Sequence, residues 1–155
     1  MPGYGILPAD QGGGLLPWSW AEQRLRASQN YWIATVWPDG RPHLMPVWAV
    51  WDGEFVWFSS SLASRKIRNL QVNPDITLST EDAQNPVVLE GSAQTVTETV
   101  GIQYYLGLMN AKYDTDYQLD FLDATQNATV RVRPRWAFGL KESEFAGSPT
   151  RWEFP

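Results

Sequence analysis

The chain has 155 residues, which is the size of one domain and long enough to bury a core without disulfides or a structural metal. It contains no cysteine and a single histidine, His43, which excludes disulfide frameworks, thiolate catalysis, cysteine-ligated zinc and iron–sulfur clusters. A formal net charge of −5 argues against non-specific nucleic-acid binding.

Residues 1–17 are rich in glycine and proline and predict a flexible N-terminal arm. They contain no basic segment followed by an apolar stretch, so we do not interpret them as a secretory signal. No apolar run in the chain approaches the roughly 20 residues that a membrane helix needs. We therefore expect a cytoplasmic protein without a membrane partner, with one domain over residues 18–155.

The first helix is predicted from the spacing of Ser19 and Glu22. In such a capping box each side chain binds a free backbone N–H of the first helical turn. This spacing predicts a helix that begins at Ser19 and ends near Asn30.

Segments dense in β-branched and aromatic residues follow, separated by turn residues such as PDG at 38–40 and DG at 52–53. Pro46 lies inside one of these segments, and because proline cannot donate to a ladder it must lie at a bulge, at an edge or facing a ligand. Gly91 lies inside another and suggests a bulge or a close backbone approach. The predicted strands are residues 31–37, 42–51, 54–60, 75–80, 86–97, 128–133 and 135–140.

Three further helices are predicted between these strands. Helical spacing of apolar residues indicates one over 62–72, which Asn73-Pro74 ends. Another over 97–113 has Thr97 as its cap, and a short one covers 114–125. The second would bury the face that carries Val100, Tyr104, Leu108 and Ala111. Several short hairpin-connected strands with inserted helices favour an antiparallel barrel or sandwich, so the predicted fold class is mainly β.

The segment 59–69 offers the chemistry that a phosphate group requires. Ser59, Ser60 and Ser64 supply hydroxyls, and Arg65 and Lys66 supply cations at the predicted start of a helix. Phosphate binds to such charge-assisted donors and to the positive end of a helix. The alternative is an ordinary solvated face with a serine-rich turn, and these residues alone do not decide between the two.

A planar ligand has a second candidate position along the strand that contains Pro46, Val47 and Trp48. Trp48 or Phe58 would lie along the face of a flat ring system, although these residues alone favour the alternative that both side chains belong to the core. His43 is a candidate proton donor or a structural residue. The aspartates of 114–123 lack the spacing of a calcium loop, so no metal site is predicted.

Five segments in a fixed order give the chain a resemblance to a known family. It resembles the pyridoxamine 5′-phosphate oxidase-like flavin and deazaflavin oxidoreductases over roughly residues 18–141. The segments are YWIAT at 31–35, PDGRPH at 38–43, PVW at 46–48, SRKIRNLQVNP at 64–74 and EGSA at 90–93. The tail PTRWEF at 149–154 looks like that of an actinobacterial-type branch.

The resemblance implies a six-stranded antiparallel split β-barrel with peripheral helices. It implies a homodimer that binds FMN or the deazaflavin F-420 at the subunit interface. Residues 18–155 would form the cofactor-binding domain. By the same resemblance Lys66 binds the phosphate, and Asn69 belongs to the same motif as Ser64 and Arg65. Ser59 and Ser60 would approach the phosphate, and the strand 46–48 would run beside the ring system. The partner subunit would supply residues near the pocket, namely Trp136, Arg151 and Trp152.

The chain is shorter than the true pyridoxamine 5′-phosphate oxidases and lacks their paired substrate-phosphate arginine and histidine near the C-terminus, so vitamin B6 oxidation is not expected. The resemblance implies hydride transfer to a small unsaturated substrate, and because the cofactor carries that chemistry no catalytic side chain is assigned. The alternative is a non-catalytic protein that binds or carries a flavin or a tetrapyrrole. For haem, His43 would be the single available imidazole ligand.

Overall fold

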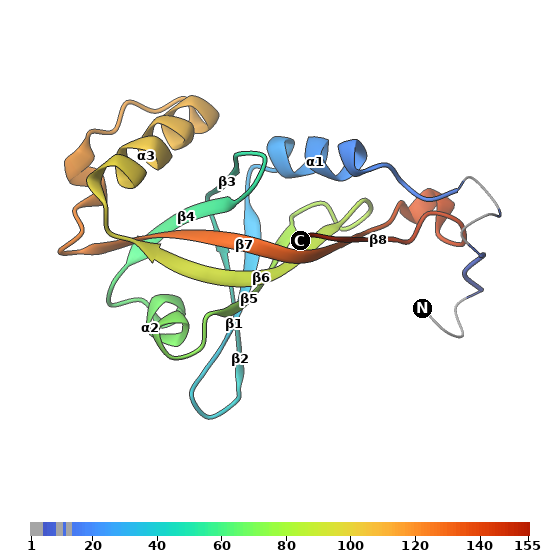
Figure 1. Ribbon diagram of the computed structural model, residues 1–155, viewed down its shortest axis with the longest axis horizontal. Coiled ribbons are helices and arrows are strands. Elements are labelled where there is room, and N and C mark those ends of the chain that lie inside the picture. The colour runs from blue at the N-terminus through green and yellow to red at the C-terminus, as the bar shows by residue number, and fades with distance from the viewer. Residues whose placement is uncertain (1–4, 9–10, 12–13) are drawn as a thin grey trace.

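In the computed structural model, residues 5–8, 11 and 14–155 are described (Figure 1). In this part of the chain eight strands form one antiparallel sheet of order β2-β1-β5-β6-β7-β4-β3, with β8 paired to β7. The strands are β1 (Tyr31–Val36), β2 (Pro42–Val47), β3 (Ala49–Trp51), β4 (Val56–Ser61), β5 (Asp75–Thr80), β6 (Val87–Val96), β7 (Asn127–Gly139) and β8 (Thr150–Glu153). The helices are α1 (Trp18–Ala27), α2 (Arg65–Val72) and α3 (Thr99–Tyr113), with short 3-10 turns η1 (Leu119–Leu122) and η2 (Glu142–Glu144).

The sheet curls around one apolar core, to which β1, β3, β4, β5, β6 and β7 all contribute buried side chains. Ala21 and Leu25 of α1 and Ile67 of α2 are buried in the same core. A second, smaller cluster lies where α3 packs over Val50 and Trp57. The mainly β split barrel with peripheral helices is therefore confirmed.

The strand boundaries differ from prediction at three places. The predicted strand 42–51 divides at Trp48 into β2 and β3. β2 is an edge strand, which explains how Pro46 is accommodated. The polar tail, for which no strand was predicted, forms β8 against the second half of β7.

β7 runs unbroken through Pro134, where two separate strands were predicted. Its pairing with β6 shifts register between Glu90 and Gly91, so that Glu90 faces Trp136 and Gly91 faces Pro134. At this bulge the missing proline N–H costs no ladder hydrogen bond. A Cβ on Gly91 would lie 2.3 Å from the carbonyl oxygen of Arg133, so the predicted close backbone approach is confirmed.

Three details of the predicted helices are wrong. The capping box does not form, because α1 begins at Trp18 after Pro17 and has no side-chain cap. Glu22 instead accepts hydrogen bonds from Arg26 (2.9 Å) and the Trp51 indole (3.3 Å). Thr97 caps nothing, since α3 begins at Thr99. The third error is the short helix predicted over 114–125, of which only the 3-10 turn η1 forms.

The predicted buried face of α3 is also wrong. Ile102, Tyr105 and Met109 are the buried residues, whereas Val100 is 79% exposed and Tyr104 is 49% exposed. α3 carries apolar residues around its whole circumference, so periodicity did not distinguish the side that packs.

Part of the predicted N-terminal arm contacts the domain. Leu16 is buried, and its backbone N–H donates to the Thr150 hydroxyl (2.9 Å). The N–H of Leu7 donates to the Ala146 carbonyl (2.8 Å). Residues 1–4, 9–10 and 12–13 of the predicted arm lie outside the described residues. None of the helices in the described ranges is long and apolar enough to span a bilayer.

Candidate functional site

The serine-rich end of β4 and the start of α2 place hydroxyls and a cation together. The Lys66 amine donates to Ser60 Oγ (3.1 Å), and the Ser60 hydroxyl donates to Ser64 Oγ (3.2 Å). A tight turn brings them together, because the Ser64 N–H donates to the Ser61 carbonyl (2.9 Å) just before α2 begins. The structure thus unites Ser60, Ser64 and Lys66, as predicted for a phosphate site.

Backbone donors of the helix are also available there. Ser64 precedes the first turn of α2 but makes no side-chain hydrogen bond to it. The N–H groups of that turn are therefore not used by the capping side chain, and such groups bind anions well.

The cations at this site lack acidic partners. No carboxylate of the described residues lies within ion-pair distance of Arg65, Lys66 or Arg68. Partial burial lowers the pKa of the Lys66 amine, because desolvation disfavours its charged form. An anion bound here would compensate both effects.

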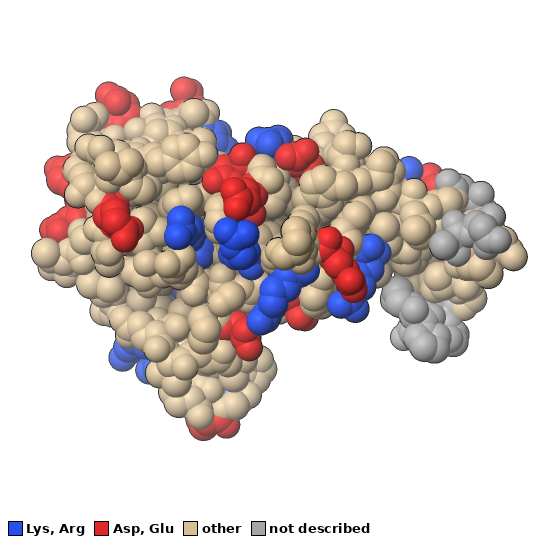
Figure 2. Space-filling model, in the orientation of Figure 1, with Lys and Arg blue, Asp and Glu red and all other residues tan. Residues whose placement is uncertain are grey.

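The opposite situation holds over β6, β7 and β8, where basic side chains lie beside acidic ones on the face shown in Figure 2. Three of these basic side chains are in ion pairs, which join Arg133 to Glu54 (3.2 Å), Arg135 to Asp75 (2.9 Å) and Arg151 to Glu153 (3.5 Å). Among the described residues, Arg131 of β7 has no ion pair either and donates only to Gln94. The start of α2 differs in that three such unpaired cations, Arg65, Lys66 and Arg68, lie within four residues of one another.

Asn69 fixes α2 against the sheet. It is fully buried, and its side-chain amide donates to the Thr35 hydroxyl of β1 (3.0 Å). Its Oδ1 atom is buried without a hydrogen-bond partner among the described residues. Asn69 therefore holds α2 against β1. It leaves one acceptor unsatisfied in the region predicted to bind phosphate.

Ser59 and Phe58 lie differently from the other predicted residues. Ser59 interacts with the Tyr105 hydroxyl of α3, because alternate strand residues point to opposite faces. The Phe58 side chain is wholly buried in the main core. The structure therefore groups neither side chain with Lys66.

Pro46, Val47 and Trp48 lie at the edge of the sheet. Pro46 pairs with Trp32 of β1, and Val47 packs against the core. Trp48 is 42% exposed and stacks on Tyr113 of α3. Tyr113 was not among the predicted residues, because no local pattern links it to the strand that it contacts.

The three C-terminal candidates form a separate group. The Arg151 guanidinium lies 4.8 Å from the centre of the Trp136 ring. Trp152 packs edge-on against Trp18 of α1 with ring centroids 5.5 Å apart. β8 and α2 lie far apart along the molecule (Figure 1), so one protomer does not bring this group to Lys66.

His43 of β2 packs against Trp37, next to the turn that joins β1 and β2. Its ring lies edge-on to Trp37 with ring centroids 6.4 Å apart, and its Nδ1 atom is buried without a partner among the described residues.

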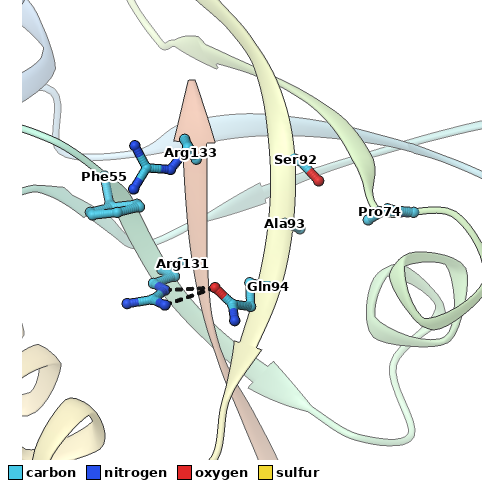
Figure 3. Close-up of a pocket in the computed structure, with 7 residues that line it drawn as sticks. All are labelled: Phe55, Pro74, Ser92, Ala93, Gln94, Arg131 and Arg133. Carbon is cyan, nitrogen blue, oxygen red and sulfur yellow. Dashed lines mark hydrogen bonds between the residues drawn. The ribbon is translucent and has the colours of Figure 1, made fainter. Parts of the chain in front are cut away.

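A cavity of about 390 Å³ lies on the outer face of β6 and β7 (Figure 3). Phe55, Arg131 and Arg133 line one side, and the Arg131 guanidinium donates two hydrogen bonds to Gln94 (3.0 and 2.8 Å). None of the thirteen predicted cofactor-binding residues lines this cavity. It is therefore distinct from the phosphate site inferred at α2.

The curled sheet and the cation–hydroxyl cluster define a split-barrel protein with a candidate phosphate site. A model of the family described as pyridoxamine 5′-phosphate oxidase matches residues 20–140. The chain belongs to this family, and the resemblance found in the sequence is confirmed. A search among curated proteins found no match.

Solved structures give the same fold. One described as an F420 reductase is 28% identical, with a TM-score of 0.61, over 73% of this chain and 91% of that chain. The conserved hypothetical protein Rv2991 from Mycobacterium tuberculosis is 25% identical, with a TM-score of 0.72, over 83% and 87%. The heme storage protein HutZ from Vibrio cholerae is 20% identical, with a TM-score of 0.63, over 74% and 87%, and shows the fold alone.

Proposed function

We propose that the protein is an oxidoreductase that binds FMN or the deazaflavin F-420 and transfers a hydride to a small unsaturated substrate. The observation that carries the proposal is the start of α2, where Arg65 and Lys66 lack acidic partners and Lys66 lies with two serine hydroxyls. Family membership and the similarity to an F420 reductase support it.

The residues at this site fit the phosphate end of such a cofactor. Lys66 and Arg65 would neutralise its charge, and Ser60 and Ser64 would donate hydrogen bonds to its oxygens. The ring system would run along β2 toward Trp48, whose indole offers an exposed aromatic face. Bound there, the cofactor would supply the hydride chemistry, while the protein binds and orients it and excludes water.

We also propose that the protein is a homodimer whose partner completes the site. Trp136, Arg151 and Trp152 lie far from α2 within one chain, so they can reach the phosphate site only from a second copy. The outer face of the β1–β2 hairpin supports association, because Trp32 (43% exposed) and Leu44 (58%) leave apolar surface in water there.

Titration of the purified protein with FMN and with F-420, followed by cofactor fluorescence, tests the proposal. We expect the wild type to bind at least one of the two. Lys66→Ala should weaken that binding about tenfold to hundredfold, since a charge-assisted hydrogen bond contributes about 1.5–3 kcal/mol. Lys141→Ala is the matched control, because Lys141 pairs with Glu144 (3.2 Å) outside the site.

Unchanged affinity in Lys66→Ala would reject the site, and failure of the wild type to bind either cofactor would reject the function. The alternative, a non-catalytic carrier of a flavin or a tetrapyrrole, binds its ligand without turnover. Steady-state assays with quinones, enones and tetrapyrroles therefore separate an enzyme from a carrier.

A further inference from the structure

Trp37 lies under the guanidinium group of Arg65. The Arg65 guanidinium carbon lies 3.7 Å from the centre of the Trp37 ring, the shortest distance among the cation–ring contacts of the described residues. Arg65 forms no hydrogen bond or ion pair with another side chain in the described ranges. Because stacking occupies the face of the guanidinium, its N–H groups at the edge stay available as donors.

The backbone of Trp37 is held in a hydrogen-bonded turn. The backbone N–H of Trp37 donates to the Arg41 carbonyl (2.9 Å), and the backbone N–H of Gly40 donates to the Trp37 carbonyl (2.9 Å). The Arg41 guanidinium also contacts the ring, with its carbon 4.5 Å from the ring centre. The ring that Arg65 contacts therefore belongs to an ordered turn between β1 and β2.

The same part of the sheet is tied to α2. Asn69 of α2 donates to Thr35, two residues before Trp37. This contact brings the β1–β2 turn to the first residue of α2, which is Arg65, and the next residue is Lys66.

The two arginines that contact Trp37 differ in charge compensation. Arg41 is paired with Asp39 (2.9 Å), so its charge is already neutralised. Arg65 has no acidic partner in the described part of the chain. Of the two, Arg65 is therefore the one whose charge is available to a bound anion.

We infer that Trp37 is a positioning residue for the phosphate site. Its indole fixes the Arg65 guanidinium beside Lys66, so that a planar cation and an amine contact one phosphoryl group of the cofactor. This inference rests on the proposed function and assigns to Trp37 a role that acts through Arg65.

The test compares ligands with and without the phosphate. FMN and riboflavin are titrated by flavin fluorescence; if the wild type binds only the deazaflavin, F-420 is compared with the same deazaflavin lacking its phosphate-bearing chain. Trp37→Leu should weaken binding of the phosphate-bearing ligand about twofold to fivefold, the range expected for one exposed cation–π contact. Binding of the phosphate-free ligand should not change.

A double-mutant cycle shows whether Trp37 acts through Arg65. Arg65→Ala should weaken FMN binding about tenfold to hundredfold, as expected for a charge-assisted contact. In the Arg65→Ala background, Trp37→Leu should have no further effect. Trp37→Phe, which keeps an aromatic face, should restore most of the affinity.

Phe55→Leu is the matched control, because Phe55 also lies near guanidinium groups, those of Arg131 (5.2 Å) and Arg133 (4.7 Å), but outside the site. It should leave binding of both ligands unchanged.

Two results would overturn the inference but not the proposed function. One is that Trp37→Leu weakens binding of the two ligands equally. The other is that Trp37→Leu has the same effect in the Arg65→Ala background as in the wild type. The Tm of Trp37→Leu shows whether this variant folds. If it does not fold, Trp37→Phe is compared with Arg65→Ala instead. Equal FMN affinities of these two variants would overturn the inference. Failure of the wild type to bind any phosphate-bearing cofactor would instead reject the proposed function.

Discussion

Tyr113 lies parallel to Trp48, with ring centroids 4.3 Å apart and ring planes within 7°. The Tyr113 hydroxyl also accepts a hydrogen bond from the Ala49 N–H (2.8 Å) and contacts the Ala49 carbonyl (3.0 Å). The C-terminal end of α3 therefore fixes both the indole of Trp48 and the backbone at the break between β2 and β3.

This relationship predicts a graded effect of two substitutions at Tyr113. Tyr113→Phe keeps the stack but removes the hydroxyl, and should lower the free energy of unfolding by about 1 kcal/mol. Tyr113→Leu also removes the stack and should lower it by about 2–3 kcal/mol in total. Urea unfolding measures both values, and equal losses would show that the stack contributes nothing.

Lys112, the residue before Tyr113, should make stability depend on alkaline pH. Burial lowers the pKa of the Lys112 amine to about 8, partly opposed by Glu81. The unfolded chain, in which the pKa of lysine is about 10.4, binds more protons between these values, so stability should rise as the pH rises from 8 to 10.

The measurement for Lys112 is urea unfolding of the wild type and of Lys112→Met at pH 7.5, 8.5 and 9.5. The stability of the wild type relative to the variant should increase along this series. Measurements stay below pH 10 because burial raises the pKa of Tyr113 to about 12, and that titration acts in the opposite direction. Parallel profiles for the two proteins would contradict the prediction.

Gly91 and Gly107 should respond oppositely to alanine. In Gly91→Ala the new Cβ would lie 2.3 Å from the Arg133 carbonyl oxygen, and the clash with backbone should cost about 2–4 kcal/mol. Gly107 lies inside α3 with nothing within 4 Å of an added Cβ. Gly107→Ala should stabilise the protein by about 0.5–1 kcal/mol through helix propensity. Thermal unfolding of both variants checks the signs.

Leu44 tests the proposed homodimer. It is 58% exposed, so Leu44→Glu should not disturb the folded chain, but a buried carboxylate should disrupt an interface formed by the β1–β2 hairpin. We expect a monomer by sedimentation velocity and weaker cofactor binding. Val100→Glu is the control, because Val100 is 79% exposed on α3, away from this hairpin. A dimeric Leu44→Glu protein would contradict the prediction.

Much of the fold was predictable because its signals are local. The turn at 52–53 is an example: Gly53 has a φ of 112°, and Asp52 accepts hydrogen bonds from the N–H groups of Glu54 (2.8 Å) and Phe55 (2.7 Å). The cluster of Ser60, Ser64 and Lys66 was predictable for the same reason, since one turn of chain holds all three.

What sequence analysis missed depends on contacts between distant segments. β8 exists because the tail pairs with β7, and no alternation of apolar residues marks it. The contacts of Trp37 with Arg65 and of Tyr113 with Trp48 likewise join separate elements. Such pairs leave no trace in local composition or periodicity.

The prolines of β2 have a consequence for self-association. On this edge strand the backbone N–H positions of residues 42, 44 and 46 point away from β1, toward the open edge of the sheet. Proline is tolerated at such positions because they make no ladder hydrogen bond to β1. Since Pro42 and Pro46 lack an N–H, only Leu44 of these three offers a donor to an approaching strand. The sheet therefore resists extension into a fibril-like stack at the place where its apolar side chains are most exposed.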